Sequence, residues 1–236
     1  MRALERILAI SDPHGENRKL LELLKKAEYE PRKDLLVIAG DMVDWGEENL
    51  DCLRTCIRLR SKGAILLKGN HEHWVQKNIE EMLGSEAWRS NPSERFYKWS
   101  HNSGAAMYHE IKGLPPEKLE TIVNFMRTLP LYYSIDNYIF SHAGANVKKP
   151  ICENTEDELE VMSKSFLRCP AYPGKMMVFG HLPTWNLHPK NSEFRLEDAK
   201  IWYDRTNQDK IGIDCGSCFG GRLAALELPS CREFYV

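Results

Sequence analysis

Three short apolar runs in the first third of the chain each end in a cluster of polar residues. The clusters are Ser-Asp-Pro-His-Gly at 11–15, Gly-Asp-Met-Val-Asp at 40–44 and Gly-Asn-His-Glu at 69–72. Segments with apolar residues at helical spacing separate the runs, which predicts a βαβαβ unit whose parallel strands are joined by right-handed crossovers. Because ligands of such sheets bind at the carboxyl ends of the strands, we expect all three clusters at one site.

The rest of the chain is expected to add a second, mixed sheet and to form a single domain over residues 1–236. A polar and aromatic stretch at about 85–113 breaks the pattern and is interpreted as a helical insertion or a lid. The spacing of apolar residues predicts strands at 7–10, 35–39, 64–67, 132–135, 138–141, 176–179, 201–203, 210–214 and 222–228. The predicted helices are 17–28, 47–60, 116–127 and 153–167.

The composition is typical of a globular enzyme rather than of a nucleic-acid or membrane protein. Hydrophobic residues make up 42%, charged residues 28%, and the net charge of −2 leaves no basic excess to hold a nucleic acid. No apolar run approaches the ~20 residues of a membrane helix, and no apolar signal core precedes the first strand, so we expect a cytoplasmic location. The seven cysteines are an odd number and are interpreted as reduced thiols, Cys215 and Cys218 included.

The clusters contain hard metal ligands, and two later histidines also follow apolar strands. Asp12 and His14 lie two residues apart and can converge on one ion, while Asp41 could bridge two ions. The six candidate ligands are Asp12, His14, Asp41, Asn70, His142 and His181. Carboxylates, imidazoles and an amide suit Mn²⁺, Fe or Zn²⁺. Two such ions ~3.5–4 Å apart activate water for phosphoester cleavage. A single histidine or aspartate after a strand is more often a packing or capping residue, but that interpretation does not account for the whole set.

The motifs resemble those of the calcineurin-like metallophosphoesterases, and within them the phosphoprotein phosphatase branch with its bacterial and lambda-phage-type serine/threonine phosphatases. Ser141-His142-Ala-Gly, Gly180-His181 and Ile213-Asp214-Cys-Gly follow in the order of that family. The resemblance implies an α/β (α+β) fold: a two-sheet β-sandwich flanked by helices (α/β/β/α), with the metal site at the strand carboxyl ends. It also implies two divalent ions, foremost Mn²⁺, with Fe or Zn as alternatives.

The resemblance assigns a role to each matching residue. The first metal would be held by Asp12, His14 and Asp41, and the second by Asp41, Asn70, His142 and His181. His71 would be the general acid, oriented by Asp44. A carboxylate-paired imidazole stays protonated near neutral pH, which agrees with that role. Asp44 could also serve as an acid at a helix entry. The remaining histidines match no ligand and are expected at the surface or in the lid; they are His73, His101, His109 and His188.

The residues expected to bind the substrate phosphate depart from the family pattern. Where the family has an arginine that binds the substrate phosphate, this chain has Trp45, and Lys68 stands where another arginine is usual. Neither side chain can replace a bidentate guanidinium. We expect the phosphate to contact Asn70, Lys68, Trp45 and Arg168, the last aligned only loosely with a family arginine. Trp45 is interpreted first as a packing residue and alternatively as an aromatic floor for a nucleobase or a phosphotyrosine ring.

These residues predict a metal-dependent phosphomonoesterase, foremost a protein serine/threonine phosphatase. The alternative within the same fold is a dinucleotide polyphosphate (diadenosine tetraphosphate) hydrolase or a nucleotide phosphodiesterase. A catalytically dead scaffold is disfavoured because all six ligands and the acid pair are intact. The expected partner is a phosphorylated protein or a nucleotide, with no membrane and no stably bound nucleic acid.

Overall fold

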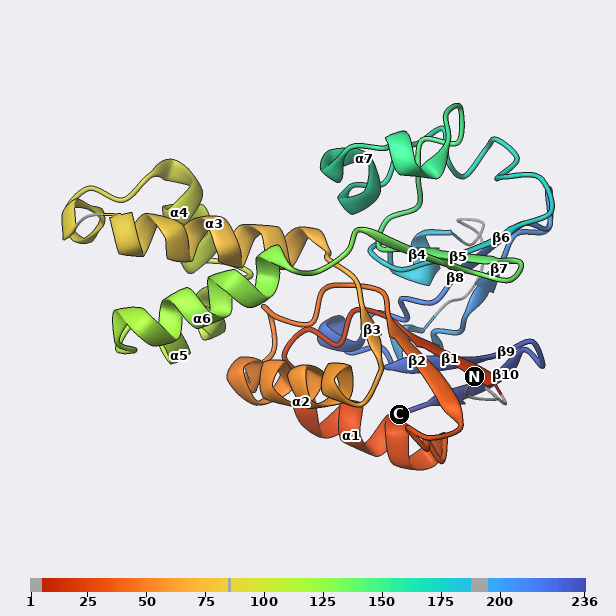
Figure 1. Ribbon diagram of the computed structural model, residues 1–236, viewed down its shortest axis with the longest axis horizontal. Helices are drawn as coiled ribbons and strands as arrows, with labels where there is room; N and C mark the ends of the chain where they lie inside the picture. The colour runs from red at the N-terminus through yellow and green to blue at the C-terminus, as the bar shows by residue number, and fades with distance from the viewer. Residues whose placement is uncertain (1–5, 85, 188–194) are drawn as a thin grey trace.

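Two five-stranded sheets face one another in the computed structural model, which describes residues 6–84, 86–187 and 195–236 (Figure 1). The first sheet has the order β10-β9-β1-β2-β3 and the second has the order β4-β5-β6-β8-β7. The first sheet consists of β1 (Arg6–Ile10), β2 (Asp34–Ile38), β3 (Ile65–Leu66), β9 (Ala224–Leu228) and β10 (Arg232–Tyr235). The second consists of β4 (Tyr132–Ile135), β5 (Tyr138–Ser141), β6 (Met176–Phe179), β7 (Trp202–Tyr203) and β8 (Lys210–Gly212).

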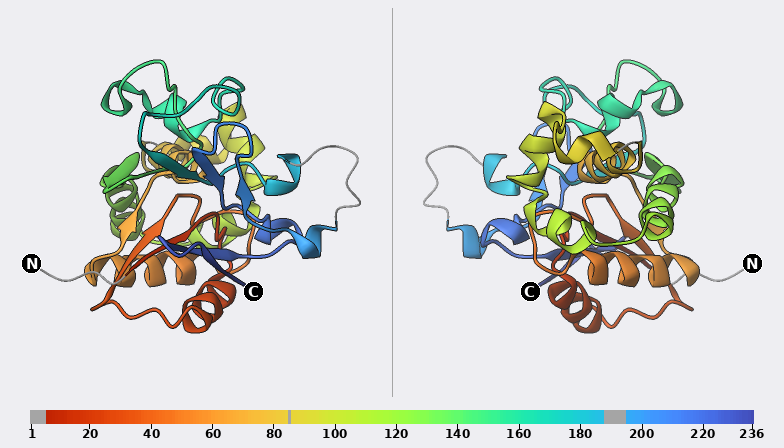
Figure 2. Two further views of the ribbon diagram at one scale, coloured as in Figure 1. Left: turned by 90° about the vertical axis from the view of Figure 1, so that its right-hand side faces the viewer. Right: turned by 90° about the vertical axis from the view of Figure 1, so that its left-hand side faces the viewer.

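Helices cover both outer faces of the sandwich, as Figures 1 and 2 show. α1 (Asn17–Lys26) and α2 (Asn49–Ser61) lie under the first sheet. The segment that contains α7 (Glu156–Glu160) lies over the second sheet. The expected α/β/β/α layering is thus confirmed. Short 3-10 turns complete the described elements: η1 (Glu86–Arg89), η2 (Ile151–Glu153), η3 (Thr184–Asn186), η4 (Leu196–Asp198) and η5 (Ser217–Phe219).

The inner strands of the first sheet are apolar on both faces because each face packs against a different layer. In β1, Leu8 and Ile10 belong to the core under α1 and α2, whereas Ile7 and Ala9 belong to the core between the two sheets. β1, β2 and β3 run parallel, with Ile7 opposite Leu35, as the βαβαβ pattern predicts. Consequently their carboxyl ends meet at one edge of the sheet.

The second sheet is mixed, as expected. The predicted hairpin pairs β4 antiparallel to β5, and the parallel strands β5, β6 and β8 follow. Phe140 packs into the core between the sheets, and its neighbour Ile139 points to the outer core below α7. β5 and β6 therefore bring two further strand ends to the edge where the first sheet ends.

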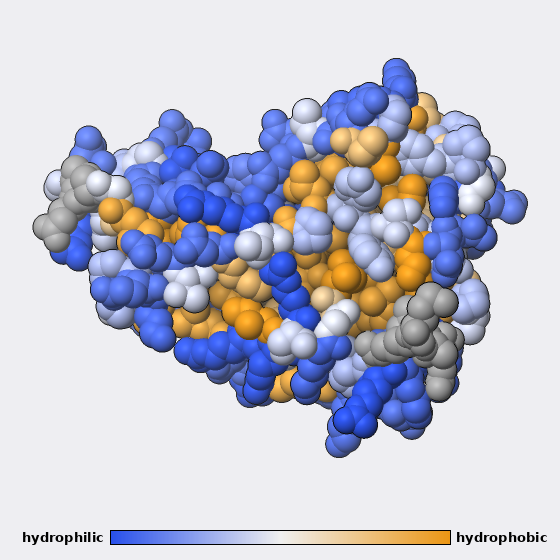
Figure 3. Space-filling view, viewed as in Figure 1, coloured by the Kyte–Doolittle hydropathy of each residue, from blue (hydrophilic) through white to orange (hydrophobic). Residues whose placement is uncertain are grey.

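Four helices extend from the sandwich to one side and form an arm (Figure 1). The arm consists of α3 (Asn70–Gly84), α4 (Glu94–Ser100), α5 (Ala105–Ile111) and α6 (Pro116–Arg127). Its core contains a cluster of aromatic rings in edge contact, among them Phe96, Trp99 and Tyr108. Within the stretch 86–113, α4 packs on α3, and α5 packs on α4 and α2. The action of this stretch as a lid remains a prediction. Hydrophobic residues gather along the arm and over the sheets on the face shown in Figure 3.

Three expectations about elements differ from the structure. The helix expected at 153–167 is limited to α7, because Phe166 is fully buried against Phe179 and the chain turns through bonded Ser163 and Ser165 to reach it. Helix α3 and strand β10 were not predicted. The spacing of Val75, Ile79 and Met82 was the available signal for α3.

Two further findings concern the whole described chain. All seven cysteines are free thiols, as expected. Among the described residues, no helix combines the length and apolarity that crossing a membrane requires.

Candidate active site

The strand ends carry an unusual backbone conformation. Ten non-glycine residues have a positive φ in the described chain, and six of them are candidate site residues: Asp12, His14, Asp41, Asp44, Trp45 and His181. This region is sterically costly for residues with a Cβ, although aspartate and histidine tolerate it better than most. These left-handed residues follow β1, β2 and β6, where they redirect side chains toward the common edge of the sheets.

Backbone and side-chain hydrogen bonds hold these turns against one another. The His14 amide donates to the Asp41 carbonyl at 2.9 Å, which joins the first two clusters. The His181 amide donates to both Asp12 carboxylate oxygens, at 3.2 and 3.1 Å, which joins the end of β6 to the first cluster. Gly180 must lack a side chain here, because a Cβ would lie 2.1 Å from an Asp12 oxygen. The site is therefore assembled from both sheets.

Four candidate ligands converge on one point. His142 Nε2 lies 3.3 Å from Asp41 Oδ2, 3.0 Å from Asn70 Oδ1 and 3.1 Å from His181 Nδ1. His181 Nδ1 also lies 2.8 Å from Asn70 Oδ1. Asn70 is the first residue of α3, and His142 follows β5 directly. Such a set of inward-facing nitrogen and oxygen atoms fits a metal ion better than it fits mutual hydrogen bonding.

The other two candidates lie on the opposite side of Asp41. His14 Nε2 is 3.7 Å from Asp41 Oδ2 and 3.9 Å from Asp12 Oδ1. His14 and His142 each direct Nδ1 to a backbone carbonyl, of Val43 at 3.0 Å and of Ala39 at 2.9 Å. When the imidazole is neutral, that bond leaves the Nε2 lone pair facing the cluster, an orientation typical of metal-bound histidine. Asp41 thus lies between two groups of donors.

The electrostatics of this cluster also favour bound cations. Asp12, Asp41 and Asp214 are buried together, and burial raises the pKa of Asp12 and the pKa of Asp214. Burial acts on Asp41 too, but the neighbouring imidazoles of His142 and His71 outweigh it and hold the pKa of Asp41 far below its usual range. Among the described residues, the ion pairs of Asp12 and Asp41 involve histidines alone. The described donors therefore fit two divalent ions at this edge.

Comparison with known proteins identifies the family. The model of the calcineurin-like phosphoesterases matches residues 5–211. The chain belongs to this family of phosphoester hydrolases. Serine/threonine-protein phosphatase 1 of Salmonella typhimurium is 35% identical over 227 residues, which cover 92% of this chain and 89% of that protein.

Other relatives of this phosphoesterase have a different activity. The symmetrical bis(5'-nucleosyl)-tetraphosphatase of Mannheimia succiniciproducens is 27% identical over 137 residues, which are 57% of this chain and 42% of that protein. A crystal structure assigned to a diadenosine tetraphosphatase superposes with a TM-score of 0.70 at 20% identity, over 98% of this chain and 92% of that one. The latter likeness concerns the fold alone. The relatives thus divide between two activities of one family.

A buried carboxylate–imidazole pair lies beside the candidate ligands. His71 Nδ1 and Asp44 Oδ2 are 2.8 Å apart, and His71 Nε2 lies 3.9 Å from Asp41. Burial lowers the pKa of His71, but the charges of Asp41 and Asp44 outweigh it and raise the pKa above its usual value. His71 thus has a buried carboxylate partner on Nδ1, while its Nε2 lies on the side of Asp41.

Trp99 of the arm also contacts this pair. Its indole Nε1 donates to Asp44 Oδ2 at 2.9 Å, the same oxygen that contacts His71. Asp44 is fully buried, and its other oxygen has no partner among the described residues. The indole and the imidazole therefore share one oxygen of this buried carboxylate. Sequence reasoning missed this residue, because the aromatic stretch gave no sign of which ring would reach the site.

Glu72 is a second residue whose role sequence reasoning missed. Its buried carboxylate accepts from the backbone amides of Asp41 at 2.8 Å, Met42 at 2.7 Å and Gly69 at 2.9 Å. Burial and the nearby charge of Asp41 raise the pKa of Glu72 to about 7. The signal was present, since Glu72 ends the third polar cluster and lies in the first turn of α3.

The residues expected to contact the phosphate do not all face the candidate metal site. Lys68 is buried, and its ammonium contacts Gln76 Oε1 at 3.1 Å and a carboxylate oxygen of Glu156. Arg168 lies in a turn, where its amide donates to the Ser165 carbonyl, and the hydrogen bonds of the described residues do not join it to the candidate ligands. Trp45 is 39% exposed, and its ring lies 6.4 Å from that of His71.

The remaining histidines lie outside the cluster. His73 is half-buried, 3.2 Å from Glu160 and 3.5 Å from Glu156, in an ion-pair group that also includes Lys68. His101 and His109 are exposed on the arm, in keeping with the expectation for them. His188 lies outside the described residues.

We expect Trp99→Phe to slow the cleavage of alkyl phosphates roughly tenfold in kcat, because a charge-assisted bond to Asp44 is lost. Bound metal should be unchanged, as should KM. Steady-state kinetics and metal analysis check this. Trp88→Phe is the matched control, since Trp88 packs in the same arm against Phe96. Equal losses in both variants would attribute the effect to arm packing instead.

Proposed function

We propose that the chain hydrolyses phosphate monoesters with two divalent metal ions, foremost Mn²⁺, held by the six ligands at the strand ends. The convergence of Asp41, Asn70 and His181 within 3.3 Å of His142 Nε2 carries the proposal. Metals bound there supply Lewis acidity that activates water and offsets the charge of the phosphoryl oxygens. Asp12 and His14 complete the donor set on the other side of Asp41.

In this proposal His71 gives its proton to the leaving oxygen of the ester. Its Nδ1 is engaged by Asp44, so Nε2 is the atom that donates. The imidazole is held on its other sides by His14 in edge contact, with ring centroids 4.8 Å apart, and by Trp74 at 4.5 Å. A ring confined in this way holds its proton in a fixed direction, which is what general acid catalysis requires.

We expect Asp41→Asn to lower metal-dependent hydrolysis of an aryl phosphate by at least about 100-fold, because the residue between the two donor groups loses its charge. Metal content should fall in parallel. Asp34→Asn is the matched control: Asp34 is equally buried but pairs with Arg6 at the opposite end of β2. Full activity in Asp41→Asn would refute the ligand assignment.

His71→Asn should slow esters with basic leaving groups by about 100-fold or more, and aryl phosphates far less, because protonation matters most for a poor leaving group. Comparing kcat for an alkyl and an aryl phosphate measures the difference. An equal loss of kcat on both esters would show that His71 is not the general acid and would leave it only a positioning role.

For the substrate we propose phosphoserine or phosphothreonine in proteins. The relative that is 35% identical over nearly the whole of both chains, a serine/threonine-protein phosphatase, supports this class. A dinucleoside polyphosphate is the second candidate. It is supported by Trp45 in place of a phosphate-binding arginine and by the ion pairing of Lys68 away from the ligands. In both candidates the site and the acid are the same.

A panel of phosphopeptides and dinucleoside polyphosphates assayed with Mn²⁺ decides between these two classes. We expect measurable hydrolysis of phosphoserine peptides, which is lost on chelation and restored by metal. A kcat/KM for dinucleoside polyphosphates that exceeds the value for every phosphopeptide would replace the first candidate by the second.

A further inference from the structure

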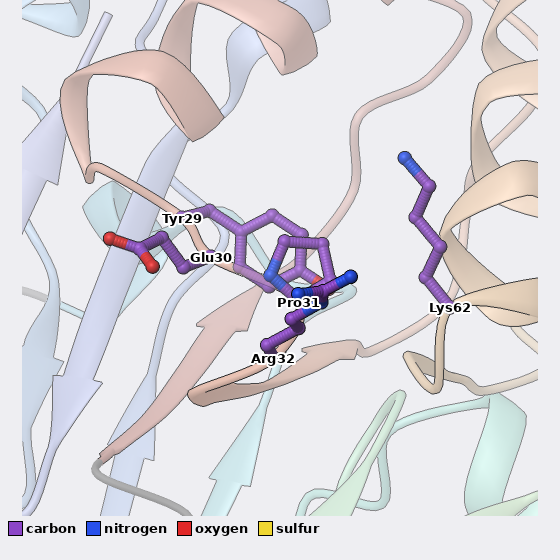
Figure 4. Close-up of a pocket in the computed structure, with 5 residues that line it drawn as sticks. All are labelled: Tyr29, Glu30, Pro31, Arg32 and Lys62. Atoms are coloured by element: carbon purple, nitrogen blue, oxygen red, sulfur yellow. The ribbon is translucent and has the colours of Figure 1, made fainter.

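A pocket of about 290 Å³ lies between α3, α4 and the loop that follows α4, beside His71 and Asp44. We call it the α3–α4 pocket; its walls include Trp74, Asn78, Arg95, Lys98 and Trp99. It is distinct from the larger cavity of about 720 Å³ in Figure 4, which lies among Tyr29, Glu30, Pro31, Arg32 and Lys62, before β2 and after α2, away from the strand carboxyl ends.

The helical repeat of α3 leads from the acid into this pocket. His71, Trp74 and Asn78 follow at intervals of three and four residues and therefore share one face of the helix. The Trp74 and His71 rings are 4.5 Å apart. Asn78 lies seven positions after His71, which corresponds to a rise of about 10 Å along the helix. A leaving group that receives its proton from His71 and continues along α3 would therefore enter the α3–α4 pocket.

The pocket offers the groups that bind a flat, nitrogen-containing ring. Trp74 is 40% exposed, so an indole face is free for stacking. Asn78 is fully buried, and its Oδ1 accepts from Arg95 Nε at 3.2 Å. The Asn78 Nδ2 donor has no partner among the described residues, which is costly for a buried amide and is relieved by a ligand acceptor.

The charges at the pocket disfavour a cationic ligand. Arg95 and Lys98 provide positive groups, and each also pairs with a glutamate on the arm: Arg95 with Glu81 at 2.8 Å and Lys98 with Glu94 at 2.6 Å. The Lys98–Glu94 pair is largely exposed and its net worth is small, whereas Glu81, the partner of Arg95, is largely shielded from solvent. An arginine beside an indole is a common surface for nucleotides.

We propose that the α3–α4 pocket binds the base of a nucleotide whose phosphoester is cleaved at the adjacent metal site. The inference rests on the proposed hydrolysis of phosphoesters, and its success would put a nucleotide in place of phosphoserine as the first substrate candidate for that site. A nucleoside spans the distance from the acid to Asn78, with its base on Trp74 and a ring acceptor on the Asn78 amide. The side chain of a phosphoserine substrate is shorter and would end beside His71. The Trp74 indole and the Asn78 amide would then have no ligand partner.

The test is a titration of the metal-loaded full-length protein with adenosine, followed by tryptophan fluorescence and calorimetry. Adenosine has no phosphate, so binding is measured without hydrolysis. We expect Trp74→Ala to weaken binding about tenfold and Trp74→Phe to recover part of it, because a smaller ring still stacks. Tyr97→Ala is the control, since Tyr97 is an exposed ring of α4 that stacks on His101 outside the pocket.

The outcomes separate this proposal from the one it rests on. Adenosine binding that Trp74→Ala weakens and Tyr97→Ala does not supports the pocket. Absence of adenosine binding, with hydrolysis of phosphoserine peptides by the unaltered protein, overturns it and leaves a protein phosphatase. Binding that depends on Trp45 instead of Trp74 also overturns it and places the base on the other side of His71. Absence of hydrolysis of every phosphoester, with adenosine still bound at Trp74, refutes the proposed function and keeps the pocket.

Discussion

The Glu72 carboxylate is the interaction on which the geometry of the site depends. It is buried and accepts from three backbone amides, two in the second polar cluster and one in the third. The amides of Asp41 and Met42 follow β2, whereas the amide of Gly69 follows β3. By binding all three, Glu72 fixes the turn that bears Asp41 relative to the start of α3, where Asn70 and His71 lie. Loss of one acceptor would leave a buried amide unpaired, which costs about 1–3 kcal/mol.

The left-handed turns show how the strand ends are used. A residue with a Cβ at positive φ costs free energy and persists only where the surroundings impose it. Six site residues adopt this conformation, and they are held by the hydrogen bonds between clusters. The cost is concentrated where carboxylates are also crowded in a buried position. Bound cations would offset the cost of the left-handed backbone and the repulsion between the buried carboxylates. Folding and metal binding are therefore expected to support one another.

The local patterns predicted the strands of both sheets except β10, but they did not predict the contacts between distant segments. Strands such as β5 and β6 and helix α6 have the predicted bounds, because apolar periodicity alone determines them. The helix expected at 153–167 fails because burial of Phe166 overrides its helical spacing. The bond from Trp99 to Asp44 joins residues 55 positions apart, and no local pattern reports such a pairing. The same holds for Lys68, whose partner Glu156 lies 88 positions away.

These distant contacts bear on how a substrate is gripped. In a site with arginines on the phosphate, much of the binding energy comes from the group that all phosphoesters share. Here one such position is an indole and another is an ammonium engaged by Gln76 and Glu156. The remaining charges that can meet the phosphate are those of the metal site and of His71. Binding energy must then come to a larger extent from the organic part of the substrate, and energy from a remote part can orient the reacting bond. Substrates with a large leaving group that contacts the arm are therefore favoured over small phosphate esters. The preference for large over small substrates is expected in kcat/KM more than in kcat.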